Sequence, residues 1–525
     1  MVSEQKMFVK WKNILSRNWL IIAVLLLAAG TRLIALNRLP AGVLPDEAYG
    51  AYNAWGLMTE GLDSRGYQYP VYFVAWGSGM SVLYSYLAIP MFKLFGVNIL
   101  AYRLPQAIVG ICSVYAIYRL GKELFDTKIA LLLAFVLSVN PWHIMNMRFG
   151  LDANMAPGMF LIGLMFLALG VQKKGGYLVG AAVFLGAALY CYALTWIMIP
   201  LFLLLCVVMF WKKIPRNRFT IIFTVLLFLI ALPLILFVLI NLGLLEEIRT
   251  PFFSIPKLAA FRGEELDIAH LGDSFRTLGN LVLSQYGGES HVASELVGAY
   301  YLFTTPFVVV GVVLHVISFF RSYKNGNNDL QYVFLAWFVS AVLMCLLNEN
   351  ITIIHTNMLH IPVIFYGAFG IARTAEYLKN RWLVPICLIF WCISFGLFLQ
   401  DYVKTQSDTG YFVDERADEA LERAKELAGE DGTVTIFGTT IIKYSYLLWY
   451  EKPAVSDYYQ NVVYEGIAAW AEMYTYGPYR YLRKLEDVTV EGVYIIYYNW
   501  VENFIDLGFE VEQVNNLYYI AVGPA

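Results

Sequence analysis

The sequence has little charge, few cysteines and none of the common motifs of nucleotide or serine-nucleophile chemistry. Charged residues make up 15% of its 525 positions, whereas soluble globular proteins carry about 25%. The absence of a P-loop, a GxGxxG motif and a GxSxG elbow argues against nucleotide-driven transport and serine hydrolysis. The six cysteines lie inside hydrophobic runs without CxxC spacing, so we expect buried core residues rather than metal ligands or disulfides.

Hydrophobic residues, by contrast, make up 59% of the chain. They fall in many separate runs of about 17–23 residues, each long enough to cross a hydrocarbon core of about 30 Å as a helix. This number of runs excludes a soluble enzyme with a single anchor. The sequence therefore predicts a polytopic α-helical membrane protein.

The clusters of Lys and Arg predict the topology, because short cytoplasmic loops are rich in these residues. Six clusters, starting with the N-terminus, are predicted to be cytoplasmic, and no cleavage site follows the first apolar run. Three apolar segments lie between the first two clusters, so one of them cannot cross; Pro90 and Lys93 mark segment 80–97 as interfacial. About eleven spans remain, at residues 19–36, 103–121, 128–147, 152–172, 176–194, 196–211, 219–241, 299–321, 330–347, 357–376 and 383–400.

Three regions are then predicted to lie outside, namely residues 37–102, residues 242–298 and the tail from 401. We accordingly divide the chain into a membrane domain, residues 1–400, and a soluble extracytoplasmic α/β domain, residues 401–525.

The tail differs from the rest of the chain in composition. It holds 9 Lys or Arg and 21 Asp or Glu, a net charge of −12, which disfavours nucleic acid as a partner. We expect an acidic amphipathic helix at 412–429 and strands at 434–438 and 492–498. Its 17 tyrosines either pack the sheet and face the headgroup region, or in part stack on sugar rings of an acceptor.

An acidic pair follows the first predicted span. Pro45 immediately precedes Asp46 and Glu47, at the start of a predicted amphipathic helix near the outer membrane surface. Both carboxylates could simply stabilise the helix N-terminus. A carboxylate in a poorly solvated site can also act as a general base that deprotonates a hydroxyl or an amine.

A second polar cluster lies in the turn NPWHIMNMRFGLDANMAP, residues 140–157. Polar groups at membrane depth are costly, which favours a use for them. Arg148 and Asp152 are four positions apart, a spacing that fits a simple ion pair on a helix face. The predicted topology also puts this turn on the same side as Asp46 and Glu47, so we expect the acids and Arg148 to face one external cavity.

These segments together resemble the GT-C membrane glycosyltransferases, in particular protein O-mannosyltransferases and the aminoarabinose transferase of lipid A. The resemblance rests on the Asp46–Glu47 pair, the turn at 140–157, YRLPQAIVG at 102–110 and GKELFD at 121–126. It implies about eleven spans and a catalytic membrane domain. It also implies inverting transfer of a sugar from a polyprenyl-phosphate donor to a protein, lipid or cell-envelope glycan at the external face of the plasma membrane.

The resemblance also carries roles to individual residues. Asp46 matches the catalytic base with Glu47 beside it, Asp152 matches a second acidic position, and Arg148 matches the basic residue of its turn. The polyprenyl phosphate leaves without needing a proton, so the reaction requires a base for the acceptor and cations for the phosphate. Candidate cations are Arg148, Arg65, Arg249, Lys257, Arg262 and Arg276.

One segment departs from the family pattern. The family often has an Arg and a Tyr before a late span with a proline, whereas this chain has His355, Asn357 and His360. His355 is therefore a candidate phosphate ligand, and satisfied structural histidines are the alternative. A spacing of five is poor for a metal pair on one helix face, so we assign no metal site. A divalent cation, Mg²⁺ or Mn²⁺, that bridges a carboxylate to the phosphate stays an open alternative.

Two other functions fit parts of the pattern. A polytopic transporter or flippase of lipid-linked sugars would line its path with polar turns, and a non-catalytic polysaccharide-assembly protein would use the tail as a binding module. The spans themselves carry few charges, which favours the transferase. We expect its partners to be a polyprenyl-phosphate-linked sugar, an extracytoplasmic acceptor and membrane lipids.

Overall fold

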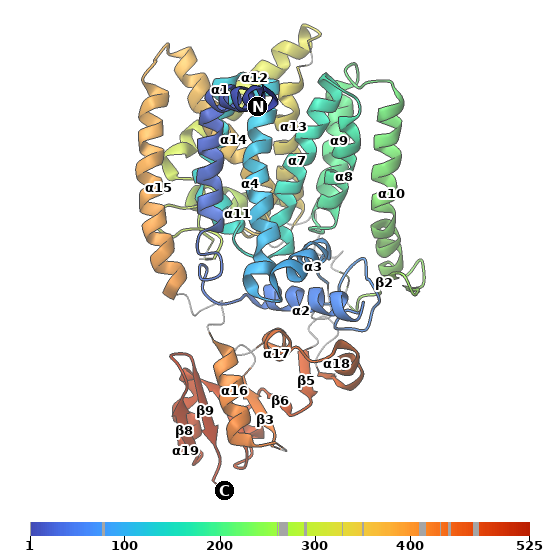
Figure 1. The fold of residues 1–525 in the computed structure, drawn as a ribbon, viewed down its shortest axis with the longest axis vertical. Helices are drawn as coiled ribbons and strands as arrows, with labels where there is room; N and C mark the ends of the chain where they lie inside the picture. Colours follow the sequence, from blue (N-terminus) through green and yellow to red (C-terminus); the bar gives the residue numbers. More distant parts are fainter. Residues whose placement is uncertain are drawn as a thin grey trace. The chain divides into compact units, whose positions relative to one another are not determined.

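The computed structural model, shown in Figure 1, forms two compact units, each built from segments that are distant in the sequence. It describes residues 2–75, 79–259, 261, 271–287, 291–327, 329–348, 351–408, 416–430, 432–438, 443–465 and 472–524. Unit 1 comprises Met1–Leu36, Arg103–Leu232 and Gly263–Thr405, and unit 2 comprises Asn37–Tyr102, Pro233–Arg262 and Gln406–Ala525. The division at residue 400 into a membrane domain and a soluble tail stays a prediction.

Unit 1 is helical throughout its named elements, and its long helices run roughly parallel or antiparallel to one another (Figure 1). Three of them, α4, α10 and α15, extend beyond the unit, by four, nine and three residues. The helices are α1 (Val2–Leu33), α4 (Ile99–Leu124), α5 (Thr127–Val139), α6 (Pro141–Asn146), α7 (Asp152–Gln172), α8 (Tyr177–Leu189), α9 (Thr195–Phe210), α10 (Arg218–Asn241), α11 (Leu271–Ser284), α12 (Thr305–Lys324), α13 (Val333–Leu347), α14 (Asn357–Tyr377) and α15 (Leu383–Asp408).

The predicted spans coincide with apolar helices, so the chain is a helical membrane protein. Among the described residues, 7 helices are long and apolar enough to cross a membrane: Ile99–Leu124, Asp152–Gln172, Arg218–Asn241, Leu302–Lys324, Leu330–Leu347, Asn357–Tyr377 and Leu383–Gln406. The other predicted spans fall on shorter apolar helices, Asn18–Leu33, Thr127–Val139, Tyr177–Leu189 and Thr195–Phe210. The total of about eleven crossings stays a prediction.

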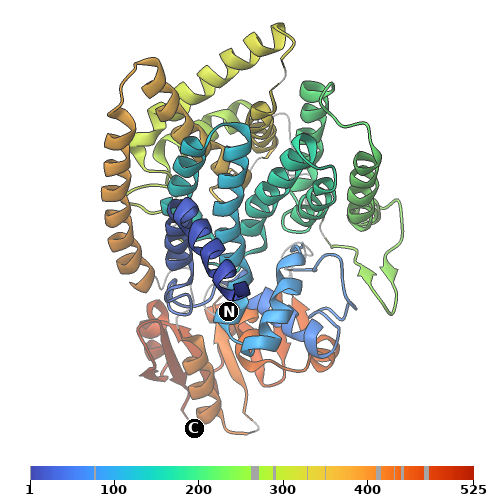
Figure 2. The same ribbon diagram turned by 45° about the horizontal axis from the view of Figure 1, so that its top comes forward.

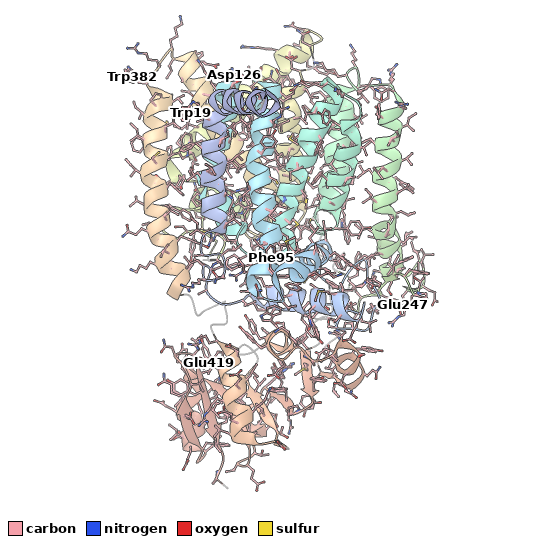
Figure 3. All side chains as sticks on the ribbon, viewed as in Figure 1. Trp19, Phe95, Asp126, Glu247, Trp382 and Glu419 are labelled. Atoms are coloured by element: carbon pink, nitrogen blue, oxygen red, sulfur yellow. The ribbon has the colours of Figure 1, made fainter. Side chains whose placement is uncertain are left out.

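Three side chains show that segments predicted to lie on the same side of the membrane share one end of unit 1. Trp19, Asp126 and Trp382 all lie at this end (Figure 3), and each is next to one of the Lys and Arg clusters. The two tryptophans are exposed by 61% and 60%, as is usual for indole rings at a membrane interface.

Glycines let two of these helices approach closely. A Cβ atom on Gly370 of α14 would overlap the carbonyl oxygen of Phe307, and one on Gly311 of α12 would lie 2.5 Å from the carbonyl oxygen of Tyr366. Small residues at a helix crossing are a common means of packing in membranes.

The expectation that all six cysteines are buried was wrong for Cys112 and Cys392, which are exposed. An apolar run in a membrane protein has an outward face toward lipid, so hydrophobic neighbours in the sequence do not ensure burial. The other four are buried or half-buried, and all six are free thiols.

Unit 2 combines helices of the first loop with the elements of the tail. The first loop forms α2 (Pro45–Thr59) and α3 (Leu83–Phe95), the latter from the segment 80–97 that was expected not to cross. A small hairpin pairs β1 (Ile248–Arg249) with β2 (Ser254–Ile255). The tail contributes α16 (Ala417–Ala428), α17 (Tyr444–Glu451), α18 (Val455–Asn461), α19 (Val501–Asp506), β3 (Val434–Phe437), β4 (Val463–Glu465), β5 (Glu472–Tyr476), β6 (Tyr479–Leu482), β7 (Val493–Tyr497), β8 (Glu510–Gln513) and β9 (Tyr518–Val522).

The tail strands form one mixed sheet in the order β4-β5-β6-β3-β7-β9-β8. Strand β3 is parallel to both β6 and β7, whereas the remaining pairs are antiparallel. Helix α16 lies against the sheet, and Figure 2 gives a second view of this layer. The predicted α/β character is confirmed, although the start of the expected helix, 412–415, lies outside the described residues.

The tail tyrosines with the least exposure pack inside this unit. Tyr494 is 3% exposed and lies in a core with Phe437, Phe504 and Phe509. This arrangement supports the packing role expected for many of the tyrosines.

Helix α2 and the tail belong to the same unit because they are in direct contact. The two carboxylate oxygens of Glu60 accept hydrogen bonds from the backbone N–H groups of Val455 and Ser456 at 2.7 and 2.9 Å. The hydroxyl of Tyr52 donates to the carbonyl oxygen of Pro453 at 2.9 Å. The tail is therefore tied to the first loop through the start of α18.

Candidate active site

The acidic pair lies in the first turn of α2, and its two carboxylates have different surroundings. Pro45 occupies the first helical turn, where its missing N–H costs no intrahelical hydrogen bond. Glu47 is fully buried, and its Oε2 accepts a hydrogen bond from the backbone N–H of Leu44 at 3.2 Å. Asp46 is exposed. The capping role thus falls to Glu47, and Asp46 presents its carboxylate outside the packed core.

A buried hydrogen-bond network fixes the loop that follows α2. The Asn53 side chain accepts a hydrogen bond from the Ser64 backbone at 2.7 Å and donates to the carbonyl oxygen of Tyr49 at 2.8 Å. The Ser64 hydroxyl donates to the Tyr49 hydroxyl at 2.9 Å, and Tyr49 in turn donates to the carbonyl oxygen of Val74 at 2.6 Å. Buried side-chain hydrogen bonds therefore tie α2 to the loop that follows it.

Asp63 is a buried acid that the sequence analysis missed. Its Oδ1 accepts hydrogen bonds from the backbone N–H groups of Arg65 and Tyr67, at 3.0 and 2.8 Å. Its Oδ2 is buried and has no hydrogen-bond partner among the described residues. Burial raises the pKa of this carboxyl to about 7, against the smaller lowering by the two backbone N–H groups. The Asp-Ser-Arg-Gly turn was the only sequence signal for it.

Two of the candidate cations lie against tyrosine rings of unit 2. The guanidinium carbon of Arg65 is 3.7 Å from the centroid of the Tyr464 ring. Arg249 donates from Nε to Glu247 at 2.8 Å and lies 4.2 Å from the centroid of the Tyr67 ring. The Nε and Nη2 atoms of Arg65 are buried without a hydrogen-bond partner in the described part of the chain. Arg65 therefore retains buried donors, whereas Arg249 is already paired with a carboxylate.

The polar turn at 140–157 begins with a short buried helix in unit 1. Asn140 caps α6 by accepting a hydrogen bond from the His143 backbone at 2.9 Å. The Nδ1 atom of His143 lies 2.6 Å from Nη2 of Arg32, which also donates to the backbone carbonyl of Leu137 at 3.1 Å. Since guanidinium groups only donate, Nδ1 accepts and the proton of the ring is on Nε2. These polar groups are used to hold α1, α5 and α6 together.

Arg148 binds the end of α1. Its Nη1 and Nη2 donate to the backbone carbonyl oxygens of Thr31 and Ile34 at 2.7 and 2.8 Å, and its Nε donates to the Tyr402 hydroxyl at 3.1 Å. The side chain is 3% exposed. A cation at a helix C-terminus satisfies carbonyl groups that lack intrahelical partners. Arg148 thus has a structural role that its sequence position did not reveal.

Asp152 is the first residue of α7 and is half-buried. Arg148 precedes this helix, so the two residues do not lie on one helix face, which was the alternative reading of their spacing. The first turn of α7 is held by α14, because the Asn357 side chain donates to the carbonyl oxygen of Ala153 at 2.6 Å.

The two histidines of the late segment have different surroundings. His360 is buried; its Nδ1 is hydrogen-bonded to the Tyr300 hydroxyl, and its Nε2 lies 2.9 Å from the carbonyl oxygen of Ile353. It is therefore a satisfied structural histidine. His355 is half-buried, and its Nδ1 lies 3.3 Å from the Thr352 hydroxyl.

The predicted site residues are divided between the two units. Asp46, Glu47, Arg65 and Arg249 belong to unit 2, and Arg148, Asp152 and His355 belong to unit 1. Arg262 lies outside the described residues. The expectation that both acidic segments face one cavity stays a prediction. Among the described residues, no group of three or more His, Cys, Asp or Glu side chains is arranged to hold a metal ion.

Known proteins share this arrangement of helices. Residues 79–240 match the family described as dolichyl-phosphate-mannose-protein mannosyltransferase. The crystal structure of ArnT from Cupriavidus metallidurans in the apo state is similar over 97% of this chain and 100% of that chain, with a TM-score of 0.59 and 10% identity. The chain has the GT-C fold. The resemblance expected from the sequence is thereby confirmed.

Other solved GT-C proteins are also similar in fold. ArnT bound to undecaprenyl phosphate gives a TM-score of 0.55, again with 10% identity and 97% and 100% of the two chains covered. The Archaeoglobus fulgidus oligosaccharyltransferase in complex with Zn and sulfate gives 0.51 at 14% identity and covers 83% of this chain and 61% of that one. No curated protein matches the chain by sequence.

Proposed function

We propose that the chain is an inverting glycosyltransferase that moves a sugar from a polyprenyl-phosphate donor to an acceptor at the external face of the membrane. The observation that carries this proposal is the GT-C fold over 97% of the chain, with an exposed aspartate in the first turn of α2. In this orientation the N-terminus is cytoplasmic and the tail is external, as the positions of Lys and Arg predict.

Asp46 is the proposed catalytic base. The acceptor oxygen or nitrogen forms a bond to the anomeric carbon, and its proton passes to the Asp46 carboxylate. The bond between that carbon and the phosphate oxygen breaks, and the phosphate leaves with the electron pair. Glu47 supports this role by capping α2, because its carboxylate is hydrogen-bonded to the backbone of Leu44.

Arg65 is the favoured cation for the leaving phosphate. It keeps two buried donors without a hydrogen-bond partner among the described residues, and a buried unsatisfied donor calls for a ligand or a water. The three hydrogen bonds of Arg148 to the end of α1 and to Tyr402 support a positioning role for that residue instead. Charge-assisted hydrogen bonds to phosphate oxygens are the expected contribution of Arg65.

The remaining candidates have less direct support. Asp152 is proposed as a second acidic group near the donor or acceptor, because it is half-buried at the start of α7. His355, Arg249 and Arg262 stay candidates for contacts to the donor.

The neighbours' ligands guide the choice of donor. ArnT was crystallised with undecaprenyl phosphate, and the archaeal oligosaccharyltransferase AglB is known in complex with an inhibitory peptide and a dolichol-phosphate. We therefore propose a lipid-linked donor of this kind.

A turnover assay tests the proposal. Purified full-length protein in lipid nanodiscs is incubated with a panel of radiolabelled polyprenyl-phosphate sugars and with solubilised cell-envelope acceptors. The proposal predicts release of free polyprenyl phosphate and label transfer from one of the donors. Movement of intact donor across vesicles without release would instead support a flippase, and binding without either would support an assembly protein.

A further inference from the structure

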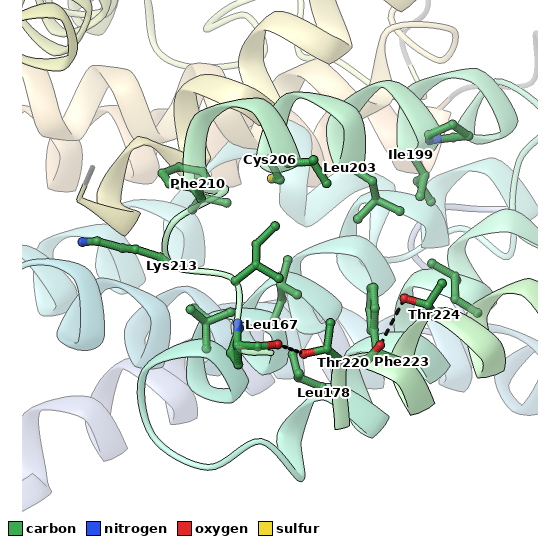
Figure 4. A pocket seen from close by; sticks show the side chains of 18 of the residues that line it. Leu167, Leu178, Ile199, Leu203, Cys206, Phe210, Lys213, Thr220, Phe223 and Thr224 are labelled. Carbon is green, nitrogen blue, oxygen red and sulfur yellow. Dashed lines mark hydrogen bonds between the residues drawn. The ribbon is translucent and has the colours of Figure 1, made fainter. Parts of the chain in front are cut away.

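A cavity between the helices of unit 1 is lined by none of the residues assigned above. It has a volume of about 440 Å³ and is bounded by α7, α8, α9 and α10. Its walls are mainly aliphatic and aromatic side chains, among them Leu203, Cys206 and Phe210 of α9 and Phe223 of α10 (Figure 4). This volume is within the range of about 300–1,000 Å³ of small-molecule sites.

The hydroxyl groups in the cavity wall are already used. The Thr220 hydroxyl donates to the carbonyl oxygen of Pro215, and the Thr224 hydroxyl donates to the carbonyl oxygen of Thr220 at 3.1 Å (Figure 4). Both donors are therefore committed to the backbone, so the wall suits hydrocarbon rather than a polar ligand.

A second cavity of about 530 Å³ adjoins the first, since both are lined by Ile214, Pro215 and Thr220. It is lined by side chains of the α9–α10 loop, including Trp211, Arg216, Asn217 and Arg218.

The α9–α10 loop is strongly basic. Residues 211–218 carry Lys212, Lys213, Arg216 and Arg218 and no acidic residue. Lys213 is paired with Asp329 at 3.6 Å, and its ammonium group points away from the apolar side chains of the first cavity (Figure 4). The start of α10 is capped by Asn217, whose Oδ1 accepts from the backbone N–H of Phe219 at 2.9 Å.

We infer that the two cavities form a binding site for an anionic phospholipid, with a hydrocarbon chain in the apolar cavity and the phosphate beside Arg216 and Arg218. Clusters of Lys and Arg next to membrane helices recognise anionic lipid headgroups. Trp211 is 61% exposed at the same loop, where an indole ring fits the interface between headgroups and hydrocarbon. Charge complementarity and the adjoining apolar cavity thus identify the same ligand class.

Native mass spectrometry with phosphatidylglycerol tests this inference on the full chain. The double variant R216Q/R218Q removes two charges at the second cavity and leaves the Lys213–Asp329 pair intact. We expect its apparent Kd for phosphatidylglycerol to rise at least tenfold. The matched control R321Q/K324Q removes two charges from the last turn of α12 and is expected to bind as the wild type does.

A second pair of variants tests the hydrocarbon site. A231F places a ring in the apolar cavity, and V225F places the same ring at a half-exposed position of α10 that does not line it. Only A231F is expected to displace phosphatidylglycerol. The assignment would be overturned if either control variant lost phosphatidylglycerol binding as strongly as its test variant. It would also be overturned if phosphatidylcholine bound equally well, or if an equimolar polyprenyl phosphate displaced phosphatidylglycerol.

Discussion

The guanidinium of Arg148 is hydrogen-bonded to the backbone carbonyl oxygen of Thr31, with Nη1 and the oxygen 2.7 Å apart. The two residues are 117 positions apart in the sequence. This contact joins the polar turn after α6 to the end of α1, and a second one to Ile34 extends it past the helix end. The turn most characteristic of the family resemblance therefore also organises the packing of α1.

Replacing Arg148 is expected to destabilise the protein. R148M leaves the carbonyl groups of Thr31 and Ile34 without this donor and should lower the free energy of unfolding by about 3 kcal/mol. Thermal unfolding in detergent measures the change. The control R373M removes a partly exposed ion pair with Glu376 and should cost less than about 1 kcal/mol. Unchanged stability of R148M together with loss of donor binding would show that Arg148 acts on the phosphate instead.

Asp63 should make the stability depend on pH. Its pKa of about 7 in the folded protein lies above the ordinary value of about 4, so the folded state binds the proton more tightly. The stabilisation of the protonated form is complete below pH 4 and is lost as the pH rises through 7, by up to about 4 kcal/mol. D63N, which carries no charge at any pH, should therefore show a smaller fall in Tm from pH 5 to pH 8.

The exposed residue Asp506 provides the control for this experiment. D506N should retain the wild-type pH dependence, because its carboxylate is in water in both states. Parallel Tm curves for wild type and D63N would show that Asp63 does not titrate in this range.

The hydrogen bonds of Glu60 should hold the start of α18 in place. E60A removes the acceptor of the Val455 and Ser456 N–H groups and should cost about 1–2 kcal/mol of local stability. Hydrogen exchange at these two amides should become roughly tenfold faster. The control E502A changes an exposed acid in the first turn of α19 and should leave the Val455 and Ser456 amides protected from exchange. Unaltered protection in E60A would contradict the assigned contact.

The close approach of α12 and α14 should not tolerate a side chain at Gly370. G370A brings a methyl group onto the carbonyl oxygen of Phe307 and should destabilise the protein by about 1–3 kcal/mol. A methyl group on Gly396 of α15 would meet no described atom within 4 Å, so G396A should be neutral or stabilise by up to about 1 kcal/mol. Equal Tm values for both variants would mean that the helices can separate at this crossing.

The sequence predicted the helical membrane fold and the α/β tail because both depend on local patterns. Apolar runs mark the membrane helices, and the runs VTIFG and GVYIIYY mark strands β3 and β7. Contacts between distant segments have no such pattern. The bond of Glu60 to the start of α18 joins positions 395 residues apart, so the shared unit of first loop and tail was not predictable.

In the candidate site, too, local features were predictable from the sequence and tertiary contacts were not. The position of Asp46 and Glu47 after a proline predicted a helix start, which the structure contains. That Glu47 is buried while Asp46 is exposed depends on how α2 packs. The burial of Asp63 likewise results from tertiary structure. The spacing of Arg148 and Asp152 fits a helix face, but α6 ends at Asn146 and α7 begins at Asp152, so no helix contains both residues.

Turnover of a polyprenyl-phosphate sugar by D46N, compared with wild type and with D418N, is the most direct test of Asp46 as the catalytic base. Asp418 is also exposed in the first turn of a helix, α16, so D418N controls for the loss of a charge at a helix N-terminus. If Asp46 is the base, D46N should fold and bind donor as the wild type does but transfer sugar at least about 100-fold more slowly, while D418N remains active. Wild-type turnover by D46N would contradict this assignment.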